Sequence, residues 1–408
     1  MARMAARARE RVLVLGDYRQ TVTVARSLAR AGYGVTLGTK DASSSTALSR
    51  YVSAVWRYDS SCAQRFLDQL EERLRGERPE YVFAVGETPL RHLLCAAARF
   101  APLATWASPD PGTIARCFDK RELYALASRL GIPSLPWQPY TDAGSWRRGA
   151  REMGFPVVIK RKDSSAQVLR RKAYICSGPE ALDAFLADIS ADPCPASLVL
   201  QKFAPGQRHN CHIGAAGGRL IAYFEQKVLR TDEPDDTGIG VLGVSVAPCA
   251  ALREYCARLT QHLSYTGIGC IQFLVDERSG GVAFLEFNAR MDSTAALPYQ
   301  LGYDFPLLAL RLAAFARGSA PCPAPLAAPY RAGKTYHWLY GDIYSWLDCA
   351  RHGRRTPVEL AAWALRAAWD ASRSYHLTWE LRDPLPTLHA YWRSYGRRRV
   401  KRFLPQIA

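Results

Sequence analysis

Short apolar runs alternate with helical stretches over the first hundred residues, and this alternation restricts the possible folds more than any other feature. The runs at residues 11–16 (RVLVLG), 35–38 and 81–85 are predicted to be buried strands, and residues 21–30 and 66–74 are predicted to be helices between them. Strand, helix and strand repeated at this spacing are typical of an open α/β unit with a parallel sheet.

The turn after the first strand argues against one common use of such a unit. Residues 16–19 (GDYR) lack the full glycine fingerprint of dinucleotide-binding folds, so a nicotinamide dehydrogenase is not favoured. Ligands of open α/β sheets nevertheless bind at the carboxyl ends of the strands. Asp17 and Glu87 follow two of these strands and are candidates for substrate contact, with a helix cap or a loop residue as the alternative.

A second series of elements begins after the Pro-rich residues 108–112 (SPDPG), and the chain as a whole is predicted to be α/β, or α+β overall. The predicted strands are 155–160, 198–203, 220–230, 268–275 and 284–290, and the predicted helices are 119–129, 252–263 and 305–316. Residues 318–329 are rich in Ala and Pro and are predicted to be a linker. Beyond them, Trp363, Trp369 and neighbouring arginines recur at helical spacing, which favours a helix packed on the rest of the protein.

Composition restricts the compartment and the partners. The 408 residues are 48% hydrophobic, which is enough for a globular protein of about two or three domains. No apolar run approaches the roughly 20 residues of a membrane helix, and eleven cysteines without metal-ligand spacing predict reduced thiols in the cytoplasm. The net charge of +17 favours anionic partners, but the arginines are dispersed, so nucleic acid is not the favoured partner. The densest basic run, 397–402, is predicted to be a solvated tail.

Three polar side chains end the last predicted strand on alternate residues. In residues 284–290 (FLEFNAR), Glu286, Asn288 and Arg290 project to one side of the strand. Carboxylate and amide oxygens two residues apart suit Mg²⁺, and the guanidinium of Arg290 suits a phosphate or a carboxylate. Gln272, on the preceding strand, would add a further oxygen to the same metal. Taken alone, the trio also fits a solvated strand edge.

Other polar residues suit a bound nucleotide. Lys120 opens a predicted helix, where the helix dipole disfavours a cation unless an anion holds it. Lys160 ends a nearly apolar strand, so its ammonium is predicted to point into a cleft. Ser164 and Ser165 lie in the polar loop that follows, whose N–H and hydroxyl groups suit phosphate oxygens.

The strand ending in Gln201, Lys202 and Phe203 is a candidate for the adenine site, because Phe203 would stack on the base while main-chain groups read its edge. Lys227 and Arg230 lie on a later strand, three residues apart, and so face different ways. Lys227 is the better candidate for a phosphate and Arg230 for the substrate. The acidic residues 232–236 that follow would attract an amine or form a solvated loop.

The order of these residues resembles that of the ATP-grasp superfamily, in particular the synthetase units of carbamoyl phosphate synthetase. The resemblance covers roughly residues 11–316. It is carried by Phe118–Lys120, Pro156–Lys160, Val199–Gly206, Gly238–Pro248 and Glu286–Arg290. This chain has Ala289 where the superfamily usually has Pro, and Gln201 where it commonly has Glu. Gln207 stands after Pro-Gly, where a carboxylate often contacts the ribose.

The resemblance implies three parts of the chain. Residues 1–112 would be an N-terminal open parallel α/β domain that precedes the ATP-grasp domain. Residues 113–318 would be a two-lobed ATP-grasp domain, with lobes at about 113–200 and 201–318. Residues 319–408 would be a helical, aromatic-rich C-terminal extension.

The resemblance also implies an ATP- and Mg²⁺-dependent, ADP-forming carboxylate–amine ligase. A carboxylate would attack the γ-phosphate of ATP to give an acyl phosphate, and an amine would then displace phosphate. Lys120 and Lys160 would hold the phosphates, while Arg290 would bridge the γ-phosphate and the incoming carboxylate. Mg²⁺, or Mn²⁺ in its place, would be held by Gln272, Glu286 and Asn288.

Two other functions are left open, namely a carboxylate kinase that does not ligate and a nucleotide-binding protein without turnover. Carbamoyl phosphate synthesis needs a duplicated unit, and biotin carboxylation is not favoured because no carrier-lysine context is present. The expected partners are a small-molecule carboxylate and an amine, with amide or peptide bonds in small-molecule metabolism as the product class. A homodimer is left open.

Overall fold

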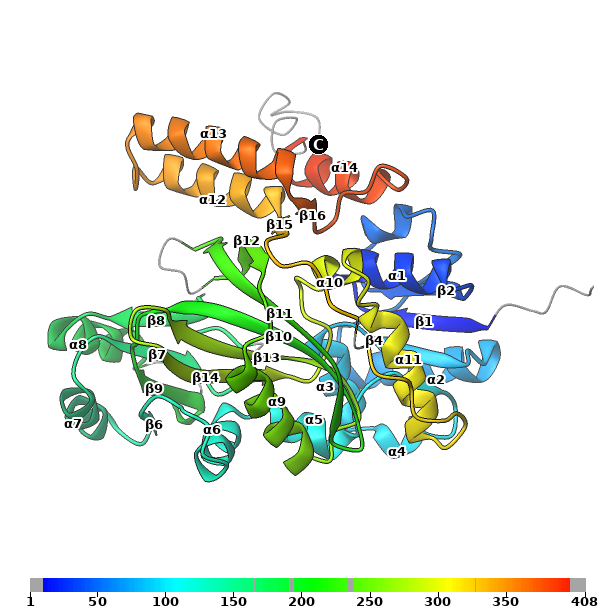
Figure 1. The fold of residues 1–408 in the computed structure, drawn as a ribbon, viewed down its shortest axis with the longest axis horizontal. Coiled ribbons are helices and arrows are strands. Elements are labelled where there is room, and N and C mark those ends of the chain that lie inside the picture. The colour runs from blue at the N-terminus through cyan, green and yellow to red at the C-terminus, as the bar shows by residue number, and fades with distance from the viewer. Residues whose placement is uncertain are drawn as a thin grey trace, which may run out of the picture.

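The computed structural model describes residues 10–396, except for residues 164–165, 170, 191, 193, 234–237 and 327. The described residues form a mixed α/β structure, as predicted, with one parallel and two largely antiparallel sheets. Figure 1 shows the parallel sheet on one side of the molecule, the smaller antiparallel sheet on the other and the large sheet between them.

The N-terminal residues form a five-stranded parallel sheet of order β3-β2-β1-β4-β5. Val12 and Val14 of the central strand enter one hydrophobic core, and Leu13 and Leu15 enter another, because helices and the large sheet cover both faces. The strands are β1 (Arg11–Leu15), β2 (Gly34–Thr39), β3 (Ala54–Arg57), β4 (Tyr81–Ala84) and β5 (Thr105–Trp106). The helices are α1 (Thr21–Arg30), α2 (Ala63–Glu77), α3 (Glu87–Leu94) and α4 (Ala97–Phe100), with a short 3₁₀ turn at Thr46–Leu48.

The smaller antiparallel sheet has the order β6-β9-β7-β8. Its strands are β6 (Trp137–Pro139), β7 (Val157–Arg161), β8 (Ala173–Cys176) and β9 (Leu198–Lys202). The helices of this part of the chain are α5 (Pro111–Phe118), α6 (Lys120–Arg129), α7 (Ala143–Met153) and α8 (Pro179–Asp188), with a 3₁₀ turn at Pro195–Ser197, and α5 packs on α6. Trp146 and Phe185 pack α7 and α8 against one face through fully buried rings. The other face is left to the cavity described below.

The large sheet has seven strands in the order β14-β13-β10-β11-β12-β15-β16. The strands are β10 (Gln207–Ala216), β11 (Arg219–Thr231), β12 (Gly240–Ser245), β13 (Gly267–Asp276), β14 (Gly281–Asn288), β15 (Thr335–His337) and β16 (Tyr375–His376). Helix α9 (Ala250–His262) lies between β12 and β13 along the chain, and α10 (Ala296–Gln300) and α11 (Phe305–Ala316) lie between β14 and β15. The predicted strands at 220–230, 268–275 and 284–290 and both predicted helices are present, whereas β10 and β12 were not foreseen.

The two faces of the large sheet are covered differently. On β10, Cys211 and Ile213 share a core with α9, while His212 on the other face packs on Phe305 of α11. Gly214 lies against Leu308 of the same helix. Asn210 shares the α11 face but lies beyond the helix, so this end of the face is free to line a cavity.

The C-terminal residues extend the large sheet and then form helices. β15 pairs with β12, β16 pairs with β15, and an antiparallel helical hairpin stands over them (Figure 1). The helices are α12 (Leu339–Arg351), α13 (Pro357–Arg373) and α14 (Leu385–Tyr391), followed by a π-helical turn at Trp392–Gly396. The helix predicted around Trp363 is α13, but only one side of it packs on the protein. Trp363 is half-buried, whereas Trp369 is 62% exposed.

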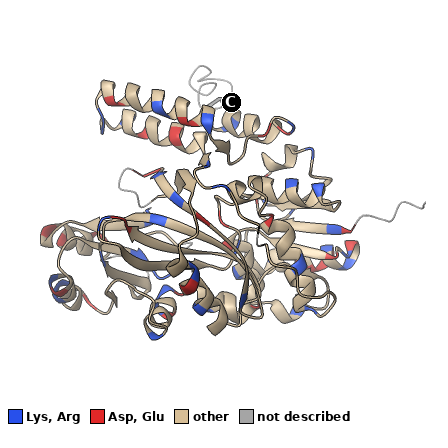
Figure 2. Ribbon diagram, in the orientation of Figure 1, with Lys and Arg blue, Asp and Glu red and all other residues tan. Residues whose placement is uncertain are grey.

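Basic residues are spread over every part of the ribbon in Figure 2 rather than gathered on one face. None of the helices within the described residues is long and apolar enough to cross a membrane.

Candidate functional site

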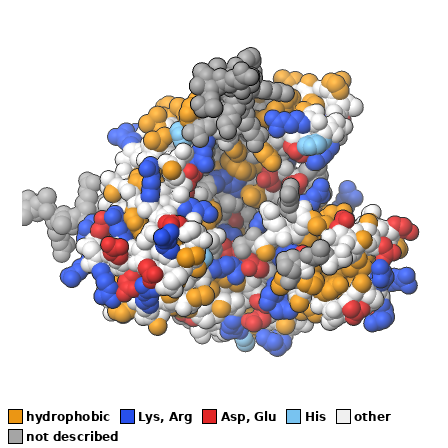
Figure 3. Space-filling view, turned by 180° about the vertical axis from the view of Figure 1, so that it is seen from behind, with side chains coloured by type: hydrophobic (Ala, Val, Ile, Leu, Met, Phe, Trp, Pro, Cys, Tyr) orange, Lys and Arg blue, Asp and Glu red, His pale blue; other side chains and the backbone are white. Residues whose placement is uncertain are grey.

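A cavity of about 850 Å³ lies where the two antiparallel sheets and the N-terminal parallel sheet meet. Its walls come from β7–β9, from the β10–β14 part of the large sheet and from the segments after β1 and β4, with Trp338 contributed by the C-terminal residues. Figure 3 shows a hollow in this region of the rear face, with basic and acidic side chains around it. A volume of this size is typical of a small-molecule or cofactor site.

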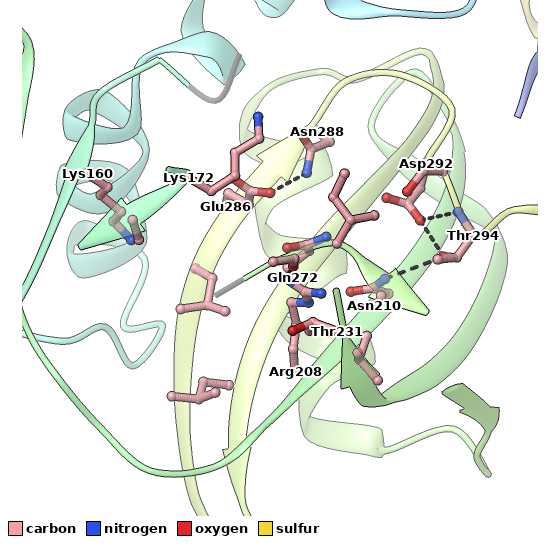
Figure 4. A pocket seen from close by; sticks show the side chains of 18 of the residues that line it. Lys160, Lys172, Arg208, Asn210, Thr231, Gln272, Glu286, Asn288, Asp292 and Thr294 are labelled. Atoms are coloured by element: carbon pink, nitrogen blue, oxygen red, sulfur yellow. Dashed lines mark hydrogen bonds between the residues drawn. The ribbon is translucent and has the colours of Figure 1, made fainter. Parts of the chain in front are cut away.

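A row of oxygen-bearing side chains crosses three strands on the cavity face. Glu286 of β14 pairs with Gln272 of β13, which pairs with Asn210 of β10, and directly paired residues point to the same side. Asn288 lies two residues beyond Glu286 and donates from Nδ2 to its Oε1 at 2.7 Å. Figure 4 shows these four side chains converging on one side of the sheet. The structure therefore brings together the three residues that the sequence assigned to a metal.

Glu286 is ionised because of its neighbours. Burial raises its pKa, but the positive charge of Lys120, the Asn288 hydrogen bond and the charges of Lys160 and Arg290 outweigh that effect and lower it to about 2. The Nζ atom of Lys120 lies 3.5 Å from Oε2 of Glu286. Lys120 is the first residue of α6 and only 6% exposed, so its unfavourable place at a helix N-terminus is offset by this carboxylate.

Lys160, near the end of β7, also points into the cavity, as the apolar strand before it predicted. Its Nζ donates to Oε1 of Gln201 at 2.7 Å and lies 5.3 Å from the centre of the Tyr124 ring. Burial and the like charge of Lys120 lower its pKa to about 7, with the charge of Glu286 acting in the opposite direction. The two lysines are thus held close together by the protein alone.

Between the two sheets lies an apolar slot. Val158 and Ile175 face it from the smaller sheet, and Leu274 and Leu285 face it from the large sheet, all of them half-buried. A register shift between β13 and β14 brings the consecutive residues Leu285 and Glu286 to the same cavity. A slot walled by apolar side chains on both sides suits a flat aromatic base.

The connection between the two sheets also borders the slot. Gln201, Lys202, Phe203 and Gln207 all line the cavity, as the proposed adenine and ribose contacts require, although Nζ of Lys202 donates to the carbonyl of Gly154. Gly206, with φ of +137°, passes so close to Val275 that an added Cβ would lie 2.7 Å from its carbonyl oxygen. Only glycine fits this close approach, which sets one sheet against the other.

Arg290 lies beyond the row of oxygen-bearing residues, 3.8 Å from Glu87 at the start of α3. Glu87 is 6% exposed and also pairs with Arg91 at 2.7 Å. The Nε atom of Arg290 is buried and has no hydrogen-bond partner, so the guanidinium can still donate to a ligand. Arg290 and Glu87 both line the cavity, and their contacts with a substrate stay predictions.

The far end of the cavity is lined by Arg19, Arg208, Asp292 and Ser293, which the sequence did not single out, together with Trp338. For Trp338 the sequence left open a cap, a dimer surface or a substrate wall. The Oδ1 atom of Asp292 accepts from the backbone N–H of Thr294 at 2.8 Å and from its hydroxyl. Burial raises the pKa of Asp292, but His212, the Thr294 hydrogen bonds and Arg290 outweigh it, so the pKa is lowered.

Thr294 ties this loop to the large sheet, since its hydroxyl accepts from Nδ2 of Asn210 at 3.5 Å (Figure 4). The same hydroxyl accepts from Nε2 of Gln226. A signal for the loop exists in the sequence, because Asp292, Ser293 and Thr294 directly follow Arg290. Arg19 follows the same strand as Asp17. The rule that ligands bind at the carboxyl ends of strands therefore applies to Arg19 as well.

Two residues predicted to act in catalysis lie elsewhere. Lys227 pairs with Glu277 at 2.7 Å, and its strand neighbour His209 precedes the α9-facing Cys211 by two residues, so Lys227 belongs to the opposite face from Gln272. Arg230 is bound by Asp342 at 2.5 Å and Asp370 at 3.3 Å from the C-terminal helices. Neither residue lines the cavity, so both assignments are corrected.

Three other predictions have a different outcome. Asp17 accepts a 2.6 Å hydrogen bond from Thr46 and does not line the cavity. Ser164 and Ser165 lie outside the described residues, as does most of the acidic run 232–236. The assignments of Ser164, Ser165 and the acidic run therefore stay predictions.

A buried cluster lies below the row of oxygen-bearing residues. His212, Cys270 and Asp292 place one potential metal-binding atom each within 4.8 Å of one another. The sequence shows no metal-ligand spacing among its cysteines, and this cluster joins residues that lie far apart along the chain. Burial lowers the pKa of His212 to about 4, with Asp292 acting in the opposite direction, so the imidazole is neutral at pH 7.

Solved structures of known proteins share this architecture. The chain superposes on the biotin carboxylase domain dimer of Hydrogenobacter thermophilus 2-oxoglutarate carboxylase, in complex with MgADP, ADP and bicarbonate, with a TM-score of 0.64 and 17% identity over 80% of this chain and 73% of that one. It also superposes on Staphylococcus aureus N5-carboxyaminoimidazole synthetase complexed with ADP, with a TM-score of 0.59 and 12% identity over 74% and 76% of the two chains. The chain has the ATP-grasp fold, which confirms the resemblance drawn from the order of its motifs.

Sequence comparisons match parts of this chain to a family model and to two known proteins. Residues 244–317 match the family model of the carbamoyl-phosphate synthase L chain, ATP binding domain. Caenorhabditis elegans pyruvate carboxylase 1 is 26% identical over 221 residues, which are 50% of this chain and 18% of that protein. The N5-carboxyaminoimidazole ribonucleotide synthase of Synechocystis is 27% identical over 171 residues, 41% of this chain and 40% of that protein. The chain therefore spans well under half the length of these two relatives.

The residues present fit ATP and Mg²⁺. Gln272, Glu286 and Asn288 offer oxygen ligands, which is the donor set that Mg²⁺ prefers. Oδ1 of Asn210, next in the row, is buried without a hydrogen-bond partner. The lysines supply the positive charge that phosphates need, and the apolar slot lies next to them.

Proposed function

We propose that this protein is an ATP- and Mg²⁺-dependent ligase that activates a carboxylate and joins it to an amine, with release of ADP. The observation that carries the proposal is the meeting, in one cavity, of Lys120 and Lys160 with the Gln272–Glu286–Asn288 set. These residues come from three separate parts of the chain. Their convergence around a slot for a flat base supports a nucleotide site rather than a solvated strand edge.

The nucleotide would lie between the two antiparallel sheets. Its base would fill the slot of Val158, Ile175, Leu274 and Leu285, beside Phe203. Its ribose would lie near Gln207, and its phosphates would extend toward Lys120 and Lys160. Mg²⁺ would be held by Gln272, Glu286 and Asn288, and it would neutralise phosphate charge when bound.

The chemical difficulty of the reaction is the approach of one anion to another. A carboxylate must reach the γ-phosphate of ATP, and fixed cations lower the repulsion at no cost of reorganisation during the reaction. Lys120 and Lys160 would hold the phosphoryl oxygens. Arg290, with a buried Nε atom that has no partner, would orient the carboxylate.

The amine would enter from the far end of the cavity. Glu87 and Asp292 are the carboxylates in that region, and either one suits the positive charge of an incoming amine. Enclosure between the two sheets would protect an acyl phosphate from water. Amide formation in small-molecule metabolism is the product class that we propose.

A second candidate uses bicarbonate as the acid, so that an amine becomes a carbamate. The names of the relatives favour this variant, since one is a carboxylase and the other a carboxyaminoimidazole ribonucleotide synthase. The bicarbonate in the Hydrogenobacter complex points the same way. The residues assigned to ATP and Mg²⁺ serve both candidates.

The test is a screen for ADP release by the purified protein with MgATP, bicarbonate and a panel of carboxylic acids, each with and without a panel of amines. We expect one combination of acid and amine to release ADP, with the amide or carbamate identified by mass spectrometry. ADP release that never depends on an amine would instead indicate a carboxylate kinase. Absence of ADP release in every combination, with ATP still bound, would indicate a binding protein without turnover. The ADP-release assay would be repeated with Mn²⁺ in place of Mg²⁺. The oligomeric state would be measured on the same purified protein.

A further inference from the structure

Two arginines at the far end of the cavity have no ion-pair partner among the residues that the structure describes. Within the described part of the chain, neither Arg19 nor Arg208 has a carboxylate oxygen within 4.0 Å. Other arginines near the cavity differ from them. Arg290 faces Glu87, and Arg161 is paired with Asp192.

The hydrogen-bond and ring contacts of Arg19 with described residues are all to neutral groups. It follows β1, and its guanidinium donates to Oγ of Ser293 at 2.8 Å and to the carbonyl of Gly240 at 3.4 Å. The guanidinium carbon lies 4.1 Å from the centre of the Trp338 ring, so the cation stacks on the aromatic face. Three segments that are far apart in the sequence therefore fix its position.

The surroundings of Arg19 favour the arrival of an anion. Burial and the like charge of Arg208 lower its pKa to about 10, with Tyr336, Asp292 and Asp232 acting in the opposite direction. The group stays protonated at neutral pH. A cation that has lost much of its water and faces a second cation is stabilised when a ligand brings negative charge.

Arg208 completes the pair from the large sheet. It lies on β10, two residues before Asn210 and on the same face (Figure 4). Its guanidinium donates to the carbonyl of Gly238 at 3.0 Å, and its Nε atom is buried without a hydrogen-bond partner. Both arginines thus hold the segment that leads into β12 and keep N–H donors for a ligand.

We propose that Arg19 and Arg208 bind a second anionic group of a substrate, a carboxylate or a phosphate, which is distinct from the reacting carboxylate and from the phosphates of ATP. The inference rests on the proposed function, because it assigns substrate to this cavity. Ser293, the partner of Arg19, lies between Asp292 and Thr294, which stand across the site from Lys160 in Figure 4. The phosphates of ATP would be held at the lysine end, so the arginine end is left for the substrate.

The second anion has two possible carriers. A diacid would present one carboxylate to Arg290 for activation and the other to the arginine pair. Alternatively, an amine substrate would carry a phosphate or carboxylate that the pair binds. In both cases a guanidinium offers paired N–H donors that match the two oxygens of the anion.

The test compares matched probes that differ by one anionic group. ADP release would be measured with succinate against butyrate as acids, and with phosphoethanolamine against ethanolamine as amines. We expect one probe with the extra anion to be used at least about tenfold better in kcat/KM than its partner. The pair that shows this preference identifies the carrier.

The variants Arg19→Gln and Arg208→Gln should remove that preference by raising the KM of the anionic probe about tenfold, with the KM of ATP unchanged. Trp338→Ala should have a smaller effect in the same direction, because Trp338 positions Arg19. Arg57→Gln is the matched control, since Arg57 is exposed, donates to the carbonyl of Ala42 and does not line the cavity.

Calorimetric binding of the same probes in the presence of MgADP separates this inference from the proposed function. Binding of an anionic probe that is lost in Arg19→Gln would support the subsite even if no ADP were released. Equal use and equal binding of the matched probes would overturn the inference while leaving the ligase intact. A rise in the KM of ATP, and not of the probe, in both arginine variants would also overturn it.

Discussion

The two ends of the cavity treat charge in opposite ways. At the lysine end, the cations meet acceptors of the protein, since Lys120 lies beside Glu286 and Lys160 donates to Gln201. At the arginine end, Arg19 and Arg208 are held by carbonyl and hydroxyl oxygens that carry no formal charge. The cations of the lysine end therefore contact acceptors of the protein, whereas those of the arginine end have no ion-pair partner among the described residues, and we expect the ligand to supply their counter-charge.

This difference predicts different consequences of mutation. Removing one charge at the lysine end disturbs a network whose members shift the pKa of one another. Removing one charge at the arginine end relieves repulsion in the free protein. The expected loss is confined to the binding of the ligand. Effects on turnover should be largest at the first end, and effects on selectivity should be confined to the second.

The largest expected effect is that of Glu286→Gln. It removes the carboxylate from the proposed metal set and the counter-charge of Lys120, so we expect turnover of ATP to fall at least about a hundredfold, or roughly 3 kcal/mol of transition-state stabilisation. The measurement is steady-state ADP release, with circular dichroism to show an unchanged fold. Glu277→Gln, at an exposed carboxylate outside the cavity, is the control. Wild-type turnover in Glu286→Gln would break the comparison at its lysine end.

The next effect concerns Lys160 and pH. Its pKa of about 7 lies below the ordinary value of 10.5, and bound phosphates would raise it again. ATP binding should therefore take up a proton between about pH 7 and 9 and weaken as the pH rises. Calorimetry in buffers of different ionisation enthalpy measures this uptake.

Lys160→Met should abolish the proton uptake and weaken ATP binding about tenfold. Lys162→Met is the matched control, because Lys162 pairs with Asp119 at 3.1 Å and does not line the cavity. The same shift acts on folding. The unfolded chain binds this proton more tightly than the folded one, so the contribution of Lys160 to the free energy of unfolding rises from about pH 7 to 10.5. Identical uptake in wild type and Lys160→Met would show that another group titrates.

A third variant, Arg230→Met, should change stability rather than turnover. Arg230 binds Asp342, which is 1% exposed and also accepts from His337 at 2.5 Å and Trp363 at 3.2 Å. Loss of the arginine leaves a buried carboxylate with fewer partners, at a cost of about 2 kcal/mol. Thermal or urea unfolding measures the loss.

The double variant Arg230→Met/Asp342→Asn should recover part of that stability, since both charges are then absent. Turnover of MgATP by Arg230→Met should stay near that of the wild type while the protein is folded. A tenfold fall in turnover at a temperature where the variant is folded would restore Arg230 to the substrate site.

The smallest effect is expected for Lys227→Gln. Its ammonium pairs with the exposed Glu277 outside the cavity, and exposed pairs contribute little. ADP release should change less than about twofold. A much larger loss would mean that Lys227 reaches the phosphates, and the division of charges between the two ends would need revision.

The lysine end could be predicted from the sequence because each of its residues is marked by its own neighbours. Lys160 ends an apolar strand, and Glu286 and Asn288 alternate along another. Their order along the chain then indicated a shared site. Cross-strand pairing supplies the remaining contact, since Gln272 lies directly opposite Glu286.

The arginine end could not be predicted in this way. Arg19 contacts Gly240, Ser293 and Trp338, each more than two hundred residues away along the chain, and nothing near Arg19 indicates those contacts. Asn210 was missed because β10 was not foreseen as a strand. Its central place in the large sheet is set by pairing with β11 and β13 rather than by a local pattern.

The two misplaced residues of β11 show a further limit. Strand alternation predicts that Lys227 and Arg230 face different ways, but their partners on β12, Val244 and Leu242, lie two residues apart. Both residues therefore share one face of the sheet, and neither lines the cavity. The register shifts around Val228 and Arg230 alter the alternation at the end of the strand. The partners of Arg230 are Asp342 and Asp370, which lie on helices after residue 318. The motifs before that residue do not indicate those helices.

The pairing of β15 with β12 has a practical consequence for truncated forms of the protein. A fragment ending at residue 318 would retain every position proposed to touch the nucleotide, yet it would bare the open side of β12 and the hollow filled by the fully buried ring of Tyr336. Such an edge invites pairing with other molecules, so the fragment should precipitate or self-associate. It would also lose the Trp338 ring on which Arg19 stacks, so its preference among the anionic probes would no longer match that of the intact protein.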